Sequence, residues 1–340
     1  MTTTLCTLYN SLYLDKGLVL YDSLCECAID FELYVLCMDD KCYEVLSDLK
    51  LHKLKPLSLS VIENDKMKVA KSNRSMAEYC WTCSSRLIQY IIETYQPECC
   101  TYIDADMYFY HDPQILVDEM LEAGKSVMMV PHRFTERNNY LAKTVGTYCV
   151  EFNSFKNDEK GLRVLNHWHE KCLECCSNLG DGIHWGDQKY MDEWTSLFPE
   201  YVHVCKNPGA GVAPWNIELY KNFNSNHNAA LYIKEDKLCS FVFYHFQSLV
   251  YLTENQINTG IPHNNKFIDY GMVDVLYFDY LTKIKIKKMM LKEKYNIFFY
   301  IKAHPSAISK ITSVKDILVQ IYDSIHKFLF PKKKYIITLC

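Results

Sequence analysis

The chain has 340 residues, of which 49% are hydrophobic and 23% are charged, a composition typical of a globular protein with a large core. Its formal net charge of −4 gives no general reason to expect nucleic-acid binding. The charge is unevenly distributed, because residues 283–340 carry 13 Lys against 3 acidic residues, a net charge of +10, whereas residues 1–282 carry −14. This asymmetry predicts that the basic segment contacts an anionic surface.

The N-terminal segment MTTTLCTLYNSLYL lacks the basic region and the long apolar run of a signal peptide. No stretch of about 18 uncharged apolar residues occurs, so we expect no membrane-spanning helix. The 16 cysteines are then typical of reduced thiols rather than of a disulfide framework. These features together predict a cytoplasmic protein.

Strand-like and helical segments alternate along the chain. We expect strands at 4–10, 31–40, 57–62, 100–104, 126–132 and 239–246, helices at 15–27, 42–50, 76–95, 113–124, 161–176, 186–194 and 265–295, and a Gly- and Pro-rich loop at 206–215. This order predicts an α/β fold with a mainly parallel sheet covered by helices. In such sheets, ligands bind at the carboxyl ends of the strands.

The segment TYIDADMYFYHDP, residues 101–113, places two carboxylates at the end of the expected central strand. In extended geometry the side chains of Asp104 and Asp106 point to the same side, so both can approach one cation. Hard cations such as Mg²⁺ prefer oxygen ligands and share their shell with phosphates and water. The alternative is that these acids form a turn or a helix cap, as we expect for Asp112 beside Pro113.

Residues in the second half of the chain are further candidates for the ligand-binding site. His245 ends a strand-like run, and an imidazole combined with carboxylates suits Mn²⁺ as well as Mg²⁺, unless it is a half-buried histidine bonded to a carbonyl. Asp187 and Gln188 open a helix at a site edge, although an N-cap role would also explain Asp187. Trp215 in GAGVAPWN offers a stacking face for a sugar, unless this is an ordinary surface loop.

Neither the cysteine patterns nor the known nucleotide-binding motifs favour a redox, zinc-binding, ATPase or dinucleotide-binding protein. Cys80 and Cys83 form a C-x-x-C sequence that we expect to pack inside a helix, since no thioredoxin-like strand precedes it. A second group has spacing that could bind zinc but lacks another C-x-x-C or an H-x-x-x-H: His167, His169, Cys172, Cys175 and Cys176. The phosphate-loop and G-x-G-x-x-G patterns are absent, which disfavours an ATPase or a dinucleotide-binding protein.

Taken together, these motifs resemble the GT-A glycosyltransferases, and in particular bacterial nucleotide-sugar-dependent enzymes akin to glycosyltransferase family 8. The resemblance covers residues 4–250 and includes, in order, TLYNSLYLDKGLVLYDSL, FELYVLCMDD, RSMAEYCWT, YIDADMYFYHDP, PHRF, GDQKYMDEW, GAGVAPWN and FYHF. It implies a GT-A domain at 1–282, with a Rossmann-like mixed sheet flanked by helices, and a basic amphipathic C-terminal extension at 283–340.

The resemblance also implies roles for individual residues. Asp104 and Asp106 match the D-x-D pair that holds Mn²⁺ or Mg²⁺ against the donor diphosphate, and His245 matches a further metal ligand. Asp187 and Gln188 match the D-Q pair beside the anomeric carbon of the sugar, which gives them catalytic roles.

Contacts with the nucleotide follow from the same resemblance. Thr7, Tyr9 and Asn10 lie where the first strand meets the nucleotide, and Asp39 lies where the second strand approaches the base. Arg74 lies in a segment that often contacts the donor.

The reaction implied is sugar transfer from a nucleoside-diphosphate sugar, with UDP as the family-based choice, to a saccharide or lipid-linked acceptor in cell-surface polysaccharide or lipopolysaccharide synthesis. The cation stabilises the charge on the leaving phosphate, and aligned groups hold the acceptor near the anomeric carbon. Family 8 enzymes retain the anomeric configuration, and the leaving phosphate is thought to help deprotonate the acceptor. The sequence agrees with this scheme in showing no obvious catalytic base.

The sequence departs from the family pattern at two positions. The segment HFQSLVYL, residues 245–252, lacks the Gly and the phosphate-binding Lys that usually follow the H-F motif, so a diphosphate contact is unassigned. Cys149 in TVGTYCVEF stands where relatives tend to have Asn, which leaves the acceptor contacts open.

The C-terminal segment SVKDILVQIYDSIHKFLFPKKK, residues 313–334, carries apolar residues at helical spacing followed by three lysines. Such a helix can lie on an anionic bilayer, which predicts peripheral attachment to the inner face of the plasma membrane. The alternative is a helix that packs on the body with its basic side in solvent.

Other functional classes remain as alternatives. A sugar nucleotidyltransferase shares the fold and the use of a metal, but it would need a Gly-rich, Arg-containing loop after the first strand, which LYNSLYLDKG lacks. A non-catalytic protein that binds nucleotide sugars or carbohydrates would keep the site without turnover.

Overall fold

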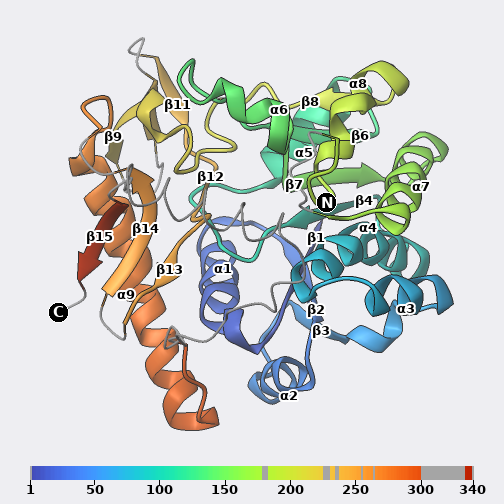
Figure 1. The fold of residues 1–340 in the computed structure, drawn as a ribbon, viewed down its shortest axis with the longest axis horizontal. Coiled ribbons are helices and arrows are strands. Elements are labelled where there is room, and N and C mark those ends of the chain that lie inside the picture. The colour runs from blue at the N-terminus through green and yellow to red at the C-terminus, as the bar shows by residue number, and fades with distance from the viewer. Residues whose placement is uncertain are drawn as a thin grey trace, which may run out of the picture.

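The computed structural model describes residues 2–177, 183–224, 230–233, 237–253, 256–262, 265–299 and 334–338. Within these residues, seven strands form one mixed sheet in the order β3-β2-β1-β4-β7-β6-β8, with helices on both faces (Figure 1). Its strands are β1 (Thr3–Tyr9), β2 (Phe31–Cys37), β3 (Leu54–Ser58), β4 (Cys99–Ile103), β6 (Val127–Pro131), β7 (Tyr148–Lys156) and β8 (Val202–Val204). The expected mixed α/β sheet flanked by helices is therefore confirmed.

Most neighbouring strands of this sheet are parallel. β1 pairs in parallel with β2 and β4, β2 with β3, and β6 with β8, whereas β7 runs antiparallel to both β4 and β6. Because β1 and β4 are parallel neighbours, their carboxyl ends meet at one edge of the sheet. Tyr9 and the acidic segment after Ile103 therefore lie at the same edge, where ligands bind in sheets of this kind.

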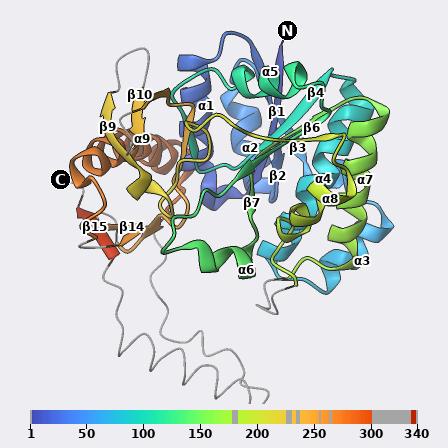
Figure 2. The ribbon, with the colours of Figure 1, turned by 90° about the horizontal axis from the view of Figure 1, so that it is seen from above.

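Both faces of the sheet are buried under helices. The helices are α1 (Leu14–Cys27), α2 (Asp40–Leu49), α3 (Asp65–Ser72), α4 (Met76–Tyr95), α5 (Gln114–Glu122), α6 (Ala142–Val145), α7 (Glu159–Glu174), α8 (Trp194–Leu197) and α9 (Tyr270–Tyr295). One apolar cluster joins alternate strand residues such as Leu5 and Leu33 to α1, α2 and α5, and a second joins Cys6 and Tyr34 to α3, α4 and α7. Figure 2 shows α4 and α7 side by side on one face and α1 on the other. In agreement with this two-sided burial, all seven residues of β1 and six of the seven residues of β2 are buried.

Shorter strands lie beyond the main sheet. They are β5 (Met107–Phe109), β9 (Tyr220–Asn224), β10 (Ala230–Ile233), β11 (Leu238–Ser240), β12 (Phe243–His245), β13 (Val250–Tyr251), β14 (Gln256–Pro262) and β15 (Lys334–Thr338). Short 3-10 helices cover Ser11–Tyr13, Leu59–Val61, Asn139–Leu141, Lys189–Glu193 and Ile217–Leu219. The antiparallel pairing of β5 with β12 sets His245 opposite Met107 and therefore beside Asp106.

Helix α9 packs its basic half on the acidic body. Three of its lysines form ion pairs with acids of α1 and α2: Lys283 with Glu26 at 2.5 Å, Lys287 with Asp22 at 2.6 Å, and Lys294 with Asp48 at 2.9 Å. The helix is continuous across residues 282 and 283, where the sequence placed the start of a separate extension. That division stays a prediction, because residues 300–333, with most of the amphipathic segment at 313–334, lie outside the described residues.

Most predicted elements are confirmed, and the differences have physical reasons. The strand expected at 57–62 is wrong in part, because β3 ends at Ser58 and a 3-10 turn follows. The strand expected at 239–246 is divided into β11 and β12. Strand β7 was not predicted, because its buried polar residues Glu151, Asn153 and Ser154 interrupt the apolar pattern. Thr101 of β4 satisfies one of them, through a 2.6 Å hydrogen bond with Ser154.

Among the described helices, none combines the length and the apolar composition needed to cross a membrane.

The loop at 206–215 makes a close backbone contact that can be tested. A Cβ atom at Gly209 would lie 1.7 Å from the carbonyl oxygen of Ser240. We expect Gly209→Ala to lower the free energy of unfolding by about 3 kcal/mol, because the backbone of one segment must move. Gly124→Ala is the control, since its φ of +66° costs about 1 kcal/mol but its Cβ meets open space. Urea unfolding measures both, and equal losses would contradict the close contact.

Candidate active site

A cavity of about 710 Å³ opens at the carboxyl edge of β1 and β4. Its wall includes the ends of both strands, the first turn of α4, and segments around 132, 187, 215 and 245. Seven of the residues predicted for the site line it: Tyr9, Asn10, Asp104, Asp106, Asp187, Gln188 and His245. The structure thus brings together residues that are spread over most of the chain.

Asp104, Asp106 and His245 form the acidic wall of this cavity. The Nε2 atom of His245 lies 3.1 Å from Oδ1 of Asp106 and 3.6 Å from Oδ2 of Asp104. Backbone bonds hold the three residues in place, because Phe246 N–H donates to the Asp106 carbonyl at 2.8 Å and His245 N–H donates to Val212 at 2.9 Å. The alternative of a histidine bonded only to a carbonyl is wrong, since both ring nitrogens face carboxylates.

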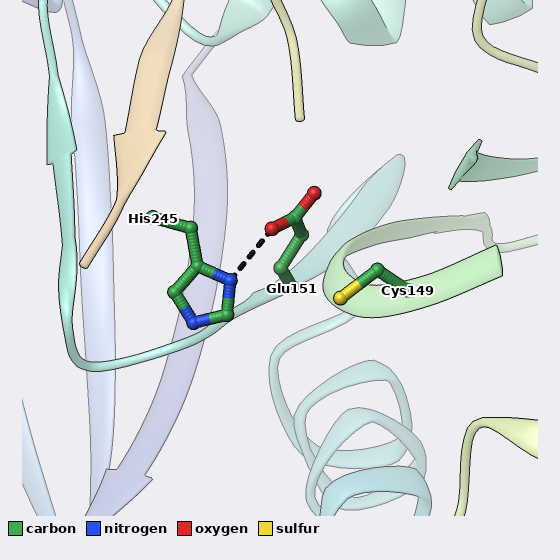
Figure 3. Close-up of side chains that lie close together, drawn as sticks. All are labelled: Cys149, Glu151 and His245. Carbon is green, nitrogen blue, oxygen red and sulfur yellow. Dashed lines mark hydrogen bonds and ion pairs between the residues drawn. The ribbon is translucent and has the colours of Figure 1, made fainter. Parts of the chain in front are cut away.

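Glu151 of β7 is a member of this cluster that the sequence did not reveal. Its Oε2 lies 2.6 Å from Nδ1 of His245, and its side chain is fully buried (Figure 3). The pairing of β7 with β6 shifts register between Asn153 and Cys149, so Glu151 lies where the strand bulges. Bulges often re-aim a side chain beside a site. Neither a periodic pattern nor a known motif marks such a position in the sequence.

Glu151 determines which nitrogen of His245 faces the acids. With a proton on Nδ1 donated to Glu151, Nε2 presents a lone pair to Asp104 and Asp106, which are themselves acceptors. Three acceptors facing one another need a proton or a cation among them. Two carboxylates and an imidazole nitrogen are ligand types that Mn²⁺ or Mg²⁺ accepts. The ligand atoms of these three residues are not all within 4.8 Å of one another, so binding one ion would draw the two carboxylates together. A carboxylate behind a ligating histidine is the usual supporting partner of a metal site.

The protonation of the cluster follows the same geometry. Burial raises the pKa of Asp104 to about 6, against the opposing effect of His245. Burial also opposes ionisation of Asp106, but the charge and hydrogen bond of His245 and the charge of Lys16 together lower the pKa of Asp106 to about 2. For His245 itself, burial lowers the pKa, while Asp106, Cys149 and Glu151 raise it well above its usual value. In the absence of a cation, a proton on His245 therefore balances the acids.

A second set of potential ligand atoms lies on the other side of the imidazole. Within the described part of the chain, one group of three places all its ligand atoms within 4.8 Å of one another: Cys149, Glu151 and His245 (Figure 3). The 2.6 Å hydrogen bond between Glu151 and Nδ1 leaves no room for a cation between them. Burial raises the pKa of the Cys149 thiol well above its usual value, so it is a poor ligand. The Nε2 side is therefore the better cation site.

Asp187 and Gln188 form another part of the wall. Asp187 is 5% exposed, and its Oδ2 is buried without a hydrogen-bond partner. Burial raises its pKa to about 7, and nearby Asp104 adds to the effect. Gln188 is fixed by a 2.7 Å bond from its Nε2 to the Val145 carbonyl. The N-cap alternative for Asp187 is wrong, because the 3-10 helix that follows is capped at Gln188.

Trp215 is held rigidly on the wall. Its Nε1 donates to the His132 carbonyl at 2.7 Å, and its ring meets the imidazole of His245 edge-on, with centroids 5.6 Å apart. Arg133 fixes the same loop by donating to the carbonyl oxygens of Cys205, Asn207 and Ala210. The segment is thus a built part of the cavity and not an ordinary surface loop.

Three other predicted nucleotide contacts do not line the cavity. Among the residues that line the cavity, the structure does not place Thr7, Asp39 or Arg74. Thr7 is fully buried in β1, and Arg74 donates to Thr82 and to the Leu173 carbonyl. Asp39 caps α2 and accepts two hydrogen bonds from Ser11, which supports the turn that carries Asn10. Their contacts with a nucleotide stay predictions.

The two groups of cysteines considered for redox chemistry and zinc binding lie in the helices α4 and α7 and next to the end of α7. Cys80 and Cys83 lie in α4, where Cys83 is fully buried in the core. In α7, His169 hydrogen-bonds with Ser85 at 3.1 Å, and Cys172 is buried. No three of the histidines and cysteines predicted as a zinc group come close enough to share an ion, and all five lie within the described residues.

Comparison with known proteins gives relatives over most of the chain. No protein-family model matches it. The uncharacterized protein YfnF of Bacillus subtilis (strain 168) is 29% identical over 304 residues, which are 88% of this chain and 98% of that protein. The uncharacterized protein YfnD of the same organism is 29% identical over 282 residues, covering 82% of this chain and 88% of that protein.

Among solved structures, the chain is similar to mouse xyloside xylosyltransferase 1, with 14% identity, a TM-score of 0.49, and coverage of 73% of this chain and 98% of that one. It is also similar to the galactosyltransferase LgtC in complex with donor and acceptor sugar analogues, with 11% identity, a TM-score of 0.48, and coverage of 72% and 87%.

The role of Glu151 can be tested by metal binding. We expect Glu151→Gln to weaken Mn²⁺ binding about 10- to 100-fold, because the neutral amide no longer supports the imidazole as a ligand. Titration followed by the electron paramagnetic resonance signal of free Mn²⁺ measures the affinity. Glu119→Gln is the matched control, since Glu119 makes a 2.7 Å bond with His203 outside the cavity wall. Unchanged affinity in Glu151→Gln would show that Glu151 does not support the site.

Proposed function

We propose that this protein is a metal-dependent glycosyltransferase that moves a sugar from a nucleoside-diphosphate sugar to a saccharide or glycolipid acceptor. The observation that carries the proposal is the meeting of the D-x-D carboxylates with His245, 139 residues later in the chain, on the wall of a cavity at the carboxyl edge of the sheet. Asp187, Gln188 and Trp215 line the same cavity. Its volume is in the range of pockets that enclose small ligands.

In this proposal Asp104, Asp106 and His245 hold Mn²⁺ or Mg²⁺, and Glu151 orients His245. A divalent cation bound there supplies a Lewis acid that stabilises negative charge on the leaving phosphate. Tyr9 and Asn10, at the end of β1, contact the nucleotide, for which UDP is the choice that the family resemblance favours.

Asp187 and Gln188 position the sugar in this scheme. The unpartnered Oδ2 of Asp187 can accept a hydrogen bond from a sugar hydroxyl, and a fixed Gln188 limits where the anomeric carbon can lie. Such alignment lowers the entropic part of the barrier. We further propose transfer with retention, in which the leaving phosphate helps to deprotonate the acceptor.

The acceptor and the location follow from the charge pattern. We propose a cytoplasmic enzyme of polysaccharide or lipopolysaccharide synthesis whose tail contacts an anionic membrane, where a lipid-linked acceptor would be found. Lysines of α9 are already paired with the body, so the residues after this helix are the better candidates for membrane contact.

The metal assignment has a direct test. We expect Asp106→Asn to abolish metal-dependent sugar transfer or donor hydrolysis while the melting temperature stays near that of the wild type, because a neutral amide replaces a cation ligand. Asp112→Asn is the control from the same segment, since Asp112 accepts backbone bonds from Gln114 and Ile29 outside the cavity. Full activity in Asp106→Asn would exclude the metal assignment.

The donor and the class of protein are tested with the wild type. In a thermal-shift panel of UDP-, GDP-, CMP- and dTDP-sugars, we expect one donor to raise the melting temperature, more strongly with Mn²⁺, since a ligand of the native state stabilises it. Turnover of that donor separates an enzyme from a binding protein. Formation of a nucleotide sugar from a nucleoside triphosphate and a sugar phosphate would instead favour a nucleotidyltransferase.

Membrane contact by the C-terminal tail, the residues after Phe299, can be tested separately. A chain ending at Phe299 keeps α9 whole, and we expect it to bind vesicles containing phosphatidylglycerol more weakly than the full chain does. Co-sedimentation at low and physiological salt measures the difference. Equal binding by the two chains would contradict membrane contact through the tail.

A further inference from the structure

The cavity wall has an unusual charge composition for a site that would bind a diphosphate. Among the described residues that line it, none is Lys or Arg, whereas Asp104, Asp106 and Asp187 are acidic. Fully buried Glu151 adds a fourth acid directly behind His245. A divalent cation compensates part of this charge, but a leaving diphosphate adds more negative charge to the same place. A further fixed positive group is therefore expected close by.

Lys16, in the first turn of α1, is the basic residue placed there. Its side chain is 5% exposed, and its Nζ lies 3.9 Å from Oδ2 of Asp106. On the other side, Nζ lies 4.2 Å from the ring centre of Tyr13. Tyr13 and Asp106 both line the cavity, so the ammonium lies directly behind its wall.

This ammonium has fewer partners than a buried charge requires. Its partners are the Leu249 carbonyl, at a long 3.4 Å, and the side chain of Tyr13. The adjacent carboxylate of Asp15 is occupied, because Oδ1 accepts from the backbone N–H of Lys16 and Oδ2 accepts from the Tyr251 hydroxyl at 2.5 Å. At 3.9 Å, Asp106 is beyond hydrogen-bonding distance. Neither the Leu249 carbonyl nor Tyr13 carries a full negative charge, so a buried ammonium with three donors has capacity for another anionic partner.

Lys16 also contacts the segment that follows His245 in the chain. Residues 246–251 contain no basic residue, yet the Leu249 carbonyl of this segment contacts the Lys16 ammonium. Asp106 is bordered by His245 at Oδ1 and by Lys16 at Oδ2. An anion bound on the Asp106 side of the site would therefore meet Lys16.

We propose that Lys16 binds the diphosphate of the donor and of the nucleoside-diphosphate product, supplying from α1 the positive charge that the cavity wall lacks. This inference rests on the proposed function. The competing explanation is that Lys16 only balances the charge of Asp106. The two differ in what the ammonium does to Mn²⁺ and to a diphosphate.

The experiment uses the full-length protein, with inorganic pyrophosphate as a probe that needs no knowledge of the base or the sugar. Mn²⁺ affinity is measured alone by electron paramagnetic resonance, and pyrophosphate affinity is measured at saturating Mn²⁺ by calorimetry. We expect Lys16→Met to weaken pyrophosphate binding at least about tenfold, the usual range for loss of a charged hydrogen bond. Mn²⁺ affinity should stay equal or increase, since a neighbouring positive charge is gone.

Two further variants make the result decisive. Lys287→Met is the matched control, because Lys287 pairs with Asp22 of α1 outside the cavity, and we expect both affinities to remain at the wild-type level. Lys16→Gln removes the same charge with a shorter polar side chain, so it reports on charge even if Lys16→Met folds poorly. Unchanged pyrophosphate binding in either folded Lys16 variant would overturn the inference. Loss of both Mn²⁺ and pyrophosphate binding in both would assign Lys16 to the scaffold and would also overturn it.

The outcomes separate this inference from the proposed function. If the wild type turns over a nucleotide sugar while the Lys16 variants keep wild-type pyrophosphate affinity, only the inference about Lys16 fails. If the wild type binds no nucleotide sugar and no Mn²⁺-pyrophosphate, the proposed function and the inference fail together.

Discussion

The position of one imidazole organises the candidate site. His245 reaches the acidic pair only because β12 pairs with β5, and its other nitrogen is held by Glu151 from β7 at 2.6 Å. Three segments distant in sequence are thus fixed around a single ring. Because the backbone bonds of these strands set the ring position, the acids and the imidazole stay together without a ligand.

Acidic groups outnumber positive ones around the cavity, and their surroundings give them different pKa values. Burial raises the pKa of Asp104 to about 6 and that of Asp187 to about 7. His245 and Lys16 together lower the pKa of Asp106 to about 2. Buried carboxylates are costly unless a positive partner is near. A protonated His245 and the Lys16 ammonium are such partners in this structure. In the proposed function, a divalent cation would be a third when a diphosphate is bound.

The scaffold around the site is rigid because the sheet is buried on both sides. Helix α1 lies close to the end of β1, since a Cβ atom at Gly17 would lie 2.3 Å from the ring of Tyr9. This close approach places Lys16 of α1 beside Asp106 and sets Tyr9 on the cavity wall. Helix α9 then covers α1 through apolar contacts and ion pairs, so the element that carries Lys16 is enclosed. The packing of α1 against β1 and α9 therefore determines where the charge of Lys16 lies relative to the cavity.

The sequence alone determined the alternation of strands and helices, the edge of the sheet at which the cavity opens, and the acids and histidine gathered there. Those features depend on local periodicity, on apolar runs that end in carboxylates, and on motifs with a recognisable order. Only the tertiary structure decided that Glu151 lies behind His245, that Lys16 lies behind Asp106, and that Arg74 and Asp39 bond to other parts of the fold and do not line the cavity. The physical reason is that a strand bulge, a helix approach permitted by Gly17 and the antiparallel pairing of β5 with β12 are set by packing between segments. No stretch of sequence encodes such contacts by itself.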